Sequence, residues 1–335
     1  MSRRITASVV AVLATGTLAV APVPADAAPV FSDAESALSS SSYVGLTGMC
    51  TSSGTTTSPN QTVPIVENGG AAKVTAAASG TISGDPGDSI TTSASLSGSA
   101  SVTSTGGLPR SIDVTVAGQV TATSQQPVSA CSGSAVAVAS AELEFTLSAP
   151  VYVRLEMTHT GPSSATFYLS GNSGALSSSA SGPRSTRRLH GYLQAGTFSA
   201  SYEEQVGLPT RVSVNAATST TLHLEFWAPG AATEAPAGKA LKYLVLPAAA
   251  SCAGRSLDTV VTSRKKRAGK VKQVEYFLDD TKVKKVKHPK KGATVPVPIA
   301  AGAASELRVE VTLEPKSKGK KPKTVTSSAS YEACP

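Results

Sequence analysis

Apolar and polar residues alternate with a period of two through much of the first two thirds of the chain. The alternation recurs in six segments, at 111–123, 135–148, 151–160, 165–171, 196–206 and 220–227. Period two places apolar side chains on one face of a strand, and turn clusters such as "SGDPGDS" separate the runs. The pattern predicts an antiparallel β-sandwich, jelly-roll-like, over residues 28–227. One short helix is expected at "SDAESAL" (32–38), where Ser32 and Glu35 have capping-box spacing.

Seven shorter runs after residue 240 predict a second sandwich over residues 241–335. They lie at 241–247, 256–263, 270–278, 281–287, 294–299, 306–314 and 324–332. Pro296 and Pro298 remove two backbone donors and therefore predict an edge strand. Asp279 and Asp280 predict a tight hairpin. Val283 and Val286 are three apart, so a bulge is needed if both are to face inward.

Seven short strands at this spacing are typical of an immunoglobulin-like sandwich. The segments "KYLVLPAAASCAGRSL", "VEYFLDDTKVKKVK" and "LRVEVTLEPKSKGKKPKTVTSSASYEACP" also carry a resemblance. They resemble the C-terminal Ig-like domains of secreted proteins of high-GC bacteria, in which an LP…C…R opening leads to a Cys-Pro end. The chain departs from that pattern at Asp279-Asp280, where Asn-Gly is usual, and in its preference for Lys over Arg. The resemblance implies an extracellular accessory domain without catalytic residues.

A second, weaker resemblance lies in the first sandwich. The segment "RRLHGYLQAGTFSASYE" resembles the L-x-A-G-T-Y/F strand pair of bacterial pre-peptidase-type and other jelly-roll modules.

The first 27 residues have the pattern of a secretory signal peptide. Arg3 and Arg4 precede an apolar run, and Ala25 and Ala27 form an A-x-A cleavage site. A twin-arginine export signal is the alternative interpretation. No later apolar run reaches the roughly 20 residues that a spanning helix needs. We therefore expect a secreted or extracellular protein, associated with the cell wall as one option, without a transmembrane segment.

The four cysteines divide between the two predicted sandwiches. Sequential pairing would join Cys50 to Cys131 and Cys252 to Cys334, which places one disulfide in each, while two other connectivities remain open. The spacings are too wide for a metal cluster. Between Cys50 and Glu144 there is no aromatic residue. The core there must therefore be thin and built from Val, Ile, Leu and Ala, which makes a disulfide in that region more consequential.

Charge separates the two halves more sharply than hydropathy does. From Lys239 onward there are 21 Lys and Arg residues against 8 Asp and Glu residues, whereas residues 28–238 have 7 against 13. The boundary, residues 228–240, is rich in Pro, Ala and Gly and lacks apolar periodicity. Its composition predicts a linker between the sandwiches.

The excess cations of the second half gather in three predicted loops. Consecutive antiparallel strands send alternate loops to one end, so the loops at 263–270, 288–292 and 315–323 should meet there. These loops have twelve basic residues and no acidic ones. We predict that they bind a polyanion, either an anionic wall polymer or an acidic glycan. The candidate binding residues are Arg264, Lys265, Lys266, Arg267, Lys270, Lys290, Lys291, Lys316, Lys318, Lys320, Lys321 and Lys323.

Other interpretations of these lysines stay open. They are compatible with a role in solubility and in preventing strand addition, or with docking onto the acidic first sandwich. Lys outnumbers Arg by 17 to 4 in this half, and the loops contain no aromatic residue. Diffuse attraction is therefore favoured over readout of bases, and sequence-specific nucleic-acid binding is not expected.

The search for catalytic motifs finds none of the common ones. The chain contains no G-x-S-x-G, H-E-x-x-H, P-loop or G-x-G-x-x-G motif. His159, His223 and His288 are expected to be solvated surface residues, and His190 is uninformative. We therefore expect a non-enzymatic protein without a cofactor or a resident metal.

Acidic pairs offer weaker alternatives to this expectation. Glu142 and Glu144 share one strand face and fit solvent-facing alternation better than an acid/base pair. Asp85 and Asp88 fit a polar turn better than a calcium loop.

Two further function classes remain. The first sandwich would be a carbohydrate-binding module or an unrecognised hydrolase if the fold gathered Trp227, Tyr192, Tyr168 or glutamates in a cleft. The whole chain would be an extracellular spacer if it bound nothing.

Overall fold

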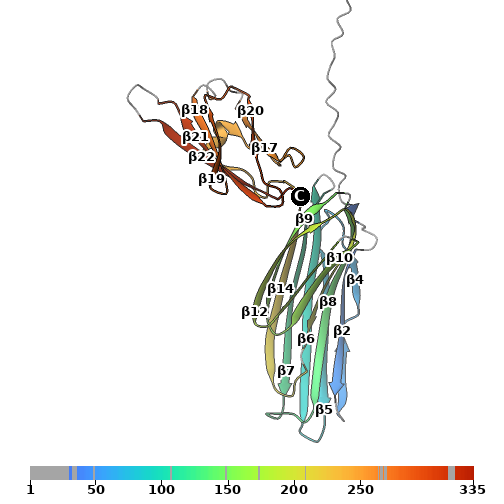
Figure 1. Ribbon diagram of the computed structural model, residues 1–335. Coiled ribbons are helices and arrows are strands. Elements are labelled where there is room, and N and C mark those ends of the chain that lie inside the picture. Colours follow the sequence, from blue (N-terminus) through green and yellow to red (C-terminus); the bar gives the residue numbers. More distant parts are fainter. Residues whose placement is uncertain are drawn as a thin grey trace, which may run out of the picture.

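Two β-sandwiches make up the described chain, and they meet end to end (Figure 1). The structure is a computed structural model, which describes residues 30–31, 36–47, 50–105, 108–147, 149–172, 174–207, 209–262, 264, 267, 270–315 and 321–335. Strands dominate both parts, and the sheets are built from antiparallel pairs, so the predicted all-β sandwich fold is confirmed.

The first sandwich contains two seven-stranded sheets. Sheet 1 has the order β11-β10-β13-β8-β2-β4, with β1 also paired to β8. Its strands are β1 (Val30–Phe31), β2 (Ala37–Thr47), β4 (Gln61–Pro64), β8 (Ser132–Leu147), β10 (Ser164–Gly171), β11 (Gly174–Ser181) and β13 (Gly196–Val206). Sheet 2 has the order β12-β9-β14-β7-β6-β5-β3. Its strands are β3 (Thr51–Thr57), β5 (Ala72–Ser83), β6 (Ser89–Thr105), β7 (Leu108–Ser124), β9 (Val151–Thr160), β12 (Arg184–Leu193) and β14 (Val214–Trp227).

The core between these sheets changes character along its length. In β5 and β6 every second side chain is buried, and these are Ala, Val, Ile and Leu with an occasional Thr or Gly. The aromatic part of the core is formed by Phe145, which stacks on Phe198 at 5.7 Å and meets Phe226 edge-on at 5.4 Å. Small apolar residues bury less area than aromatic ones, so the part without aromatics gains less from burial, as predicted.

Several strands of the first sandwich lie outside the six predicted runs. They are β1, β2, β3, β4, β5, β6, β11 and β12. In β5 and β6 the apolar positions are small or alternate with Ser and Thr. The predicted helix at 32–38 is wrong at its end, because Ala37 and Leu38 begin β2. Residues 32–35 of that prediction lie outside the described residues. The segment forms a strand rather than a helix there, and Leu38 is fully buried in the sandwich core.

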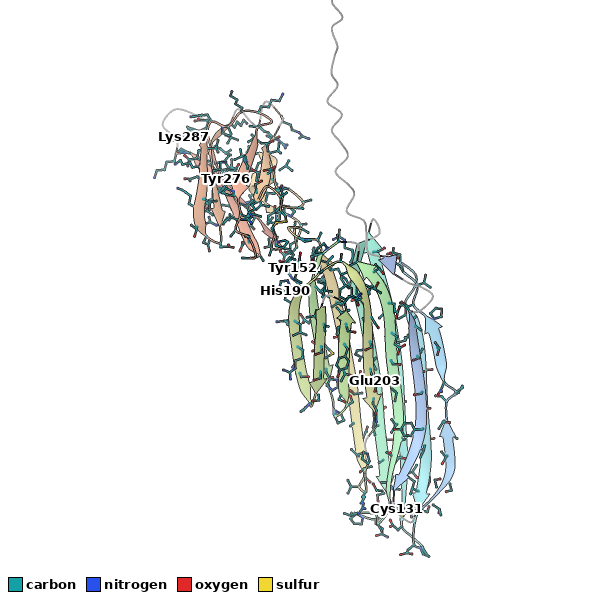
Figure 2. The ribbon with its side chains drawn as sticks, turned by 45° about the vertical axis from the view of Figure 1, so that its right-hand side comes forward. Cys131, Tyr152, His190, Glu203, Tyr276 and Lys287 are labelled. Carbon is teal, nitrogen blue, oxygen red and sulfur yellow. A yellow bond between two sulfur atoms is a disulfide. The ribbon has the colours of Figure 1, made fainter. Side chains whose placement is uncertain are left out.

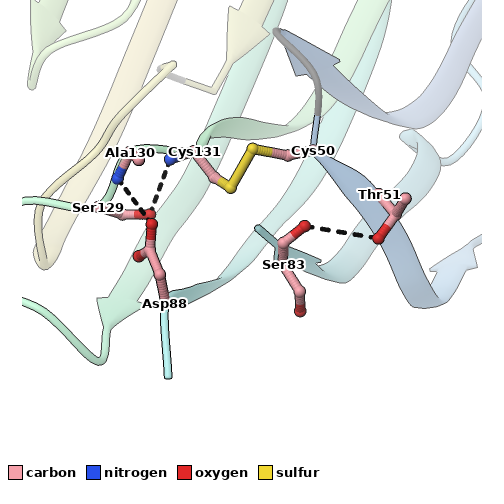
Figure 3. Close-up of a disulfide and its surroundings, with 7 residues drawn as sticks. All are labelled: Cys50, Thr51, Ser83, Asp88, Ser129, Ala130 and Cys131. Carbon is pink, nitrogen blue, oxygen red and sulfur yellow. Dashed lines mark hydrogen bonds between the residues drawn. A yellow bond between two sulfur atoms is a disulfide. The ribbon is translucent and has the colours of Figure 1, made fainter. Parts of the chain in front are cut away.

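The Cys50–Cys131 disulfide lies at one end of the first sandwich (Figure 2), and Figure 3 shows its surroundings. It joins residues that are 81 apart in the sequence. The Asp88 carboxylate accepts a hydrogen bond of 2.8 Å from the Ala130 backbone N–H, and the Ser129 hydroxyl accepts one of 3.0 Å from the Cys131 N–H. The loop before Cys131 is therefore fixed by the β5–β6 turn as well as by the sulfur bridge.

The second sandwich has a five-stranded and a three-stranded sheet. The larger sheet has the order β15-β22-β21-β18-β19 and the smaller β16-β17-β20. The strands are β15 (Ala237–Gly238), β16 (Leu244–Val245), β17 (Ser256–Val261), β18 (Val271–Leu278), β19 (Thr281–Lys287), β20 (Thr294–Pro298), β21 (Ser305–Leu313) and β22 (Lys323–Tyr331). A 3₁₀ turn, η1 (Lys239–Lys242), replaces the start of the first predicted strand. The Cys252–Cys334 disulfide lies in this part, so the sequential cysteine pairing is confirmed.

Local predictions for the second sandwich are mostly confirmed. The strand with Pro296 and Pro298, β20, lies at the edge of its sheet. Asp279 and Asp280 both have positive φ, 48° and 62°, as a tight two-residue hairpin requires. The predicted bulge is present between the β18–β19 pairs, but it leaves Val283 37% exposed, so the expectation that this side chain faces inward is wrong.

Residues 228–240, predicted as a linker, connect the two sandwiches and lie along the second one. Thr233 N–H donates to the Ser330 carbonyl at 2.9 Å, and Ala232 N–H donates to Ala248 at 2.8 Å. β15 then pairs with β22. Composition could not reveal these hydrogen bonds, because they are made by the backbone. A segment of Ala and Gly can pair with the edge of a sheet without showing the apolar alternation that marks a strand.

Candidate functional site

Strand register brings three loops of the second sandwich to one end. Val260 faces Thr294, which places the end of β17 beside the start of β20. Gln273 faces Lys287, so the start of β18 lies beside the end of β19. Leu313 faces both Val271 and Lys323, and this adds the end of β21 and the start of β22. The loops that follow β17, β19 and β21 therefore leave the sandwich at the same end.

We call this end the basic pole. Its described cations are Arg264, Arg267, Lys270, Lys290, Lys291, Lys321 and Lys323. All are exposed except Arg267, which is half-buried. Within the described part of the chain, none of the seven forms an ion pair. The other predicted binding residues, Lys265, Lys266, Lys316, Lys318 and Lys320, lie outside the described residues.

Hydrogen bonds tie the pole loops to one another. Glu314 N–H donates to the Lys270 carbonyl at 2.8 Å, and His288 N–H donates to Lys272 at 2.8 Å. Glu314 also places one carboxylate at the pole, 3.9 Å from His288 Nδ1. His288 is exposed, as predicted. The loops carry a cation excess that this one carboxylate does not balance.

The lysines of strand β19 differ from those of the loops. Lys282 and Lys285 approach the Glu275 carboxylate at 2.6 and 3.4 Å, and Lys284 Nζ donates to the Pro296 carbonyl at 2.5 Å. The hydrogen bond from Lys282 is the main reason that the pKa of Glu275 is lowered. These cations therefore already have partners within the sandwich, and Lys284 covers a free carbonyl of the edge strand β20.

The opposite end of the second sandwich is acidic and faces the first one. Asp279 and Asp280 form the β18–β19 hairpin there, and Asp280 approaches Arg308 at 3.3 Å. Glu332, just after β22, lies at the same end. Figure 2 shows Lys287 at the far side of this sandwich from Tyr152 and His190, which lie at the contact between the two parts.

Glu332 is the main polar contact between the sandwiches. Its side chain is fully buried and forms ion pairs with Arg154 of β9 and with His190 of β12, the latter at 3.4 Å. Arg154 and His190 are 41% and 48% exposed. His190, which the sequence left uninformative, is thus a junction residue, and it also stacks on Tyr152 at 5.4 Å.

Around this contact, the outward side of sheet 2 forms what we call the junction face. Cross-strand pairing arranges its side chains in three rows. The rows are Tyr192, Tyr152 and Trp227; His190, Arg154 and Glu225; and Arg188, Glu156, His223 and Asp113. The structure therefore brings Trp227 and Tyr192 together with two glutamates. Tyr168 lies apart from them on β10 of sheet 1, where it is 56% exposed.

Ion pairs order the side chains of the junction face. Arg188 binds Glu156 through two hydrogen bonds, of 2.9 and 3.2 Å, which lower the pKa of that carboxyl. His223 lies between Asp113, at 2.5 Å, and Glu225, at 3.0 Å. Burial lowers the pKa of His223, but the hydrogen bonds to Glu225 and Asp113 outweigh it, and the pKa is raised.

A cavity of about 380 Å³ opens in the junction face. It is lined by residues of β9, β12 and β14, namely Arg154, Leu155, Glu156, Arg188, Leu189, His190, His223 and Glu225. Trp227 adjoins it, since the indole N–H donates to the Glu225 carboxylate at 3.4 Å. Desolvation raises the pKa values of Tyr152 and Tyr192.

Two polar residues, His159 and Glu204, lie inside the first sandwich. His159 and Glu204 are both fully buried, so the prediction of a solvated His159 is wrong. Glu204 accepts hydrogen bonds from Tyr202 at 2.7 Å and from Ser163 at 3.1 Å, and burial together with Glu204 raises the pKa of Tyr202. His159 Nδ1 pairs with the Thr220 hydroxyl at 2.8 Å. The hydroxyl groups offset the cost of burying these two side chains.

The remaining acidic candidates lie where alternation placed them or take structural roles. Glu142 is exposed and Glu144 half-buried on the outward side of β8. Among the described residues, no group of His, Cys, Asp and Glu has the arrangement of a metal site. In that same part of the chain no helix is long and apolar enough to span a membrane. The two disulfides are compatible with an extracellular protein.

Comparison with known proteins gives little beyond this geometry. No protein-family model matches the chain, and no curated protein matches it. Among solved structures, the adhesin domain of Epf from Streptococcus pyogenes matches with a TM-score of 0.17 and 9% sequence identity, over 64% of this chain and 78% of that one. A similarity of this size transfers neither a fold nor a function.

Proposed function

We propose that this protein is an extracellular, non-enzymatic binding protein that attracts an anionic polymer through the basic pole of its second sandwich. The observation that carries the proposal is the convergence of three loops whose described cations have no acidic partner among the described residues. Cations that already have an acidic partner gain little electrostatic energy from a new anion. Unpaired cations can instead replace the counterions of a polyanion, and the release of those counterions favours binding. An anionic wall polymer or an acidic glycan supplies the matching charge.

The arrangement of charge within the second sandwich supports binding at the basic pole rather than at the opposite end. Lys282 and Lys285 of β19 share the Glu275 carboxylate, and the aspartates of the opposite hairpin lie at the junction end. The positive field is therefore strongest at the end that points away from the first sandwich (Figure 2). Lysine ammonium groups are compact and strongly hydrated, so the attraction should be diffuse and sensitive to salt rather than specific for one monomer.

Elution from a heparin column against a salt gradient tests the proposal. Lys290→Glu should elute at clearly lower salt than the unmodified protein, and the slope of log affinity against log salt should fall by roughly one for each cation that no longer binds the polymer. Arg255→Glu is the matched control. Arg255 is exposed, forms no ion pair among the described residues and lies before β17, at the end remote from the pole.

Two outcomes would count against the proposal. If Lys290→Glu and Arg255→Glu shifted elution equally, net charge rather than the pole would be responsible. If neither variant nor the unmodified protein were retained at low salt, the spacer interpretation would replace binding. Competition by soluble polyphosphate and by polygalacturonate then separates phosphate polymers from carboxylated glycans as the preferred class.

A further inference from the structure

Exposed aromatic side chains are scarce on this protein, and three aromatic residues share the junction face. The chain has 15 Phe, Tyr and Trp residues in 335. Among the described residues, Tyr43 and Tyr168 are the largely exposed aromatics, and both lie on sheet 1. Tyr192, Tyr152 and Trp227 instead occupy neighbouring strands of sheet 2, with the Tyr152 and Tyr192 rings 4.8 Å apart. Tyr152 is buried, whereas Tyr192 and Trp227 are half-buried, and a partly accessible aromatic ring beside a polar cavity is a frequent setting for ligand binding.

The charged groups around the cavity are already held in contacts with one another. Arg188 pairs with Glu156, Arg154 with Glu332, and His223 with two carboxylates. A charged ligand would have to displace one of these partners, so it gains little electrostatic energy. An uncharged ligand with many hydroxyl groups keeps the ion pairs and uses the remaining lone pairs and N–H groups as acceptors and donors.

We propose that the cavity of the junction face binds an uncharged sugar unit of a glycan. The pyranose ring packs against Trp227 and Tyr192. Its hydroxyl groups donate to the Glu225 and Glu156 carboxylates and accept from Arg188. The site is separate from the basic pole, and its ligand differs from the polyanion proposed for the pole in carrying no charge.

Trp227 makes the proposal directly measurable, because it is the only tryptophan of the chain. The full chain is titrated with neutral tetrasaccharides of glucose, N-acetylglucosamine and mannose up to millimolar concentration, while tryptophan fluorescence is followed. At least one of them should give a saturable change, and the change should persist in high salt, since neutral ligands release no counterions.

Variants locate the binding. Tyr192→Ala and Arg188→Ala should each weaken the affinity for that sugar at least tenfold, whereas Tyr168→Ala, an exposed aromatic on the other sheet, should leave it unchanged. Arg188 is 74% exposed, so its removal spares the core. Lys290→Glu, which tests the pole, should also leave the titration unchanged, so the two proposals fail independently.

The proposal is overturned by any of three results. The first is the absence of a saturable signal with all three tetrasaccharides. The second is an equal effect of Tyr192→Ala and Tyr168→Ala, and the third is a response that disappears in high salt.

Discussion

The ion pair between Glu332 and Arg154 should hold the two sandwiches in one orientation, and a double-mutant cycle measures how strongly. Glu332 is fully buried, whereas Arg154 is 41% exposed. Replacing Arg154 by Gln leaves a buried carboxylate whose remaining ion-pair partner among the described residues is His190, at 3.4 Å. The expected cost is about 3 kcal/mol, at the low end for breaking a buried pair because water reaches the site from the arginine side.

Glu332→Gln should cost less, about 1 kcal/mol, because the amide carries no charge and the desolvation penalty disappears with it. Arg154 then turns toward water. With both residues changed, little more stability should be lost than with Glu332→Gln alone. The two single costs minus the cost of the double variant should therefore give a coupling energy of about 3 kcal/mol.

Urea unfolding followed by Trp227 fluorescence is the suitable assay, because Trp227 pairs with Tyr152 at the junction. The Arg188–Glu156 pair supplies the comparison. Arg188 and Glu156 form two hydrogen bonds, but both side chains are largely exposed to water. The coupling energy of this pair should therefore be smaller than that of Glu332 and Arg154. A coupling below about 0.5 kcal/mol for Glu332 and Arg154, or a Glu332→Gln variant as unstable as Arg154→Gln, would refute the interpretation of a fixed junction.

Three further predictions concern the first sandwich. Removing the Cys50–Cys131 disulfide by Ser substitution should lower the free energy of unfolding by about 4.5 kcal/mol for a loop of this length, measured by urea unfolding. The raised pKa of His223 should appear in an NMR titration above about 6.5, and Glu225→Gln should lower it. The stability that this contact contributes is then complete below about pH 6.5 and is lost as pH rises through the folded-state pKa. Phe145→Ala should cost about 3–5 kcal/mol by the same unfolding assay.

Period-two alternation was a sufficient guide wherever large apolar residues marked one strand face. The runs at 111–123, 151–160 and 196–206 correspond to β7, β9 and β13. In β5 and β6 the contrast is between Ala or Val and Ser or Thr, so the hydropathy difference is too small to stand out. The burial pattern of β5 nevertheless alternates almost without error.

Strand parity also contained information about the two buried polar residues. In β13 the inward positions run from Phe198 through Tyr202 to Glu204, and in β9 they end at His159. If the alternation of inward and outward positions is continued by two residues along either strand, Glu204 and His159 fall on the inward side. Residue type argued for solvent instead, and of the hydroxyl groups that make burial tolerable, those of Ser163 and Thr220 come from distant parts of the chain.

The two candidate sites differed in how far sequence could predict them. The basic pole follows from loop order alone, because alternate loops of consecutive antiparallel strands share an end. The junction face depends on the order β12-β9-β14-β7, in which most neighbours are distant in sequence. Nothing local to Tyr192, Arg154 or Trp227 indicates that they lie side by side.

Distance makes the two proposed sites electrostatically independent. The basic pole lies at the far end of the second sandwich, whereas the junction face lies on the first sandwich, next to the near end. The nine residues of β21 span the second sandwich between them. At about 3.3 Å per residue this strand extends about 30 Å, whereas charges in physiological salt are screened over about 8 Å. The field of the pole therefore fades well before the junction face. A polymer held at the pole leaves the charge balance of the sugar cavity unchanged. If the ion pair of Glu332 fixes the junction, the rigid second sandwich sets the distance and the relative direction of the two binding surfaces. One chain can then hold an anionic polymer and a neutral glycan at a constant separation.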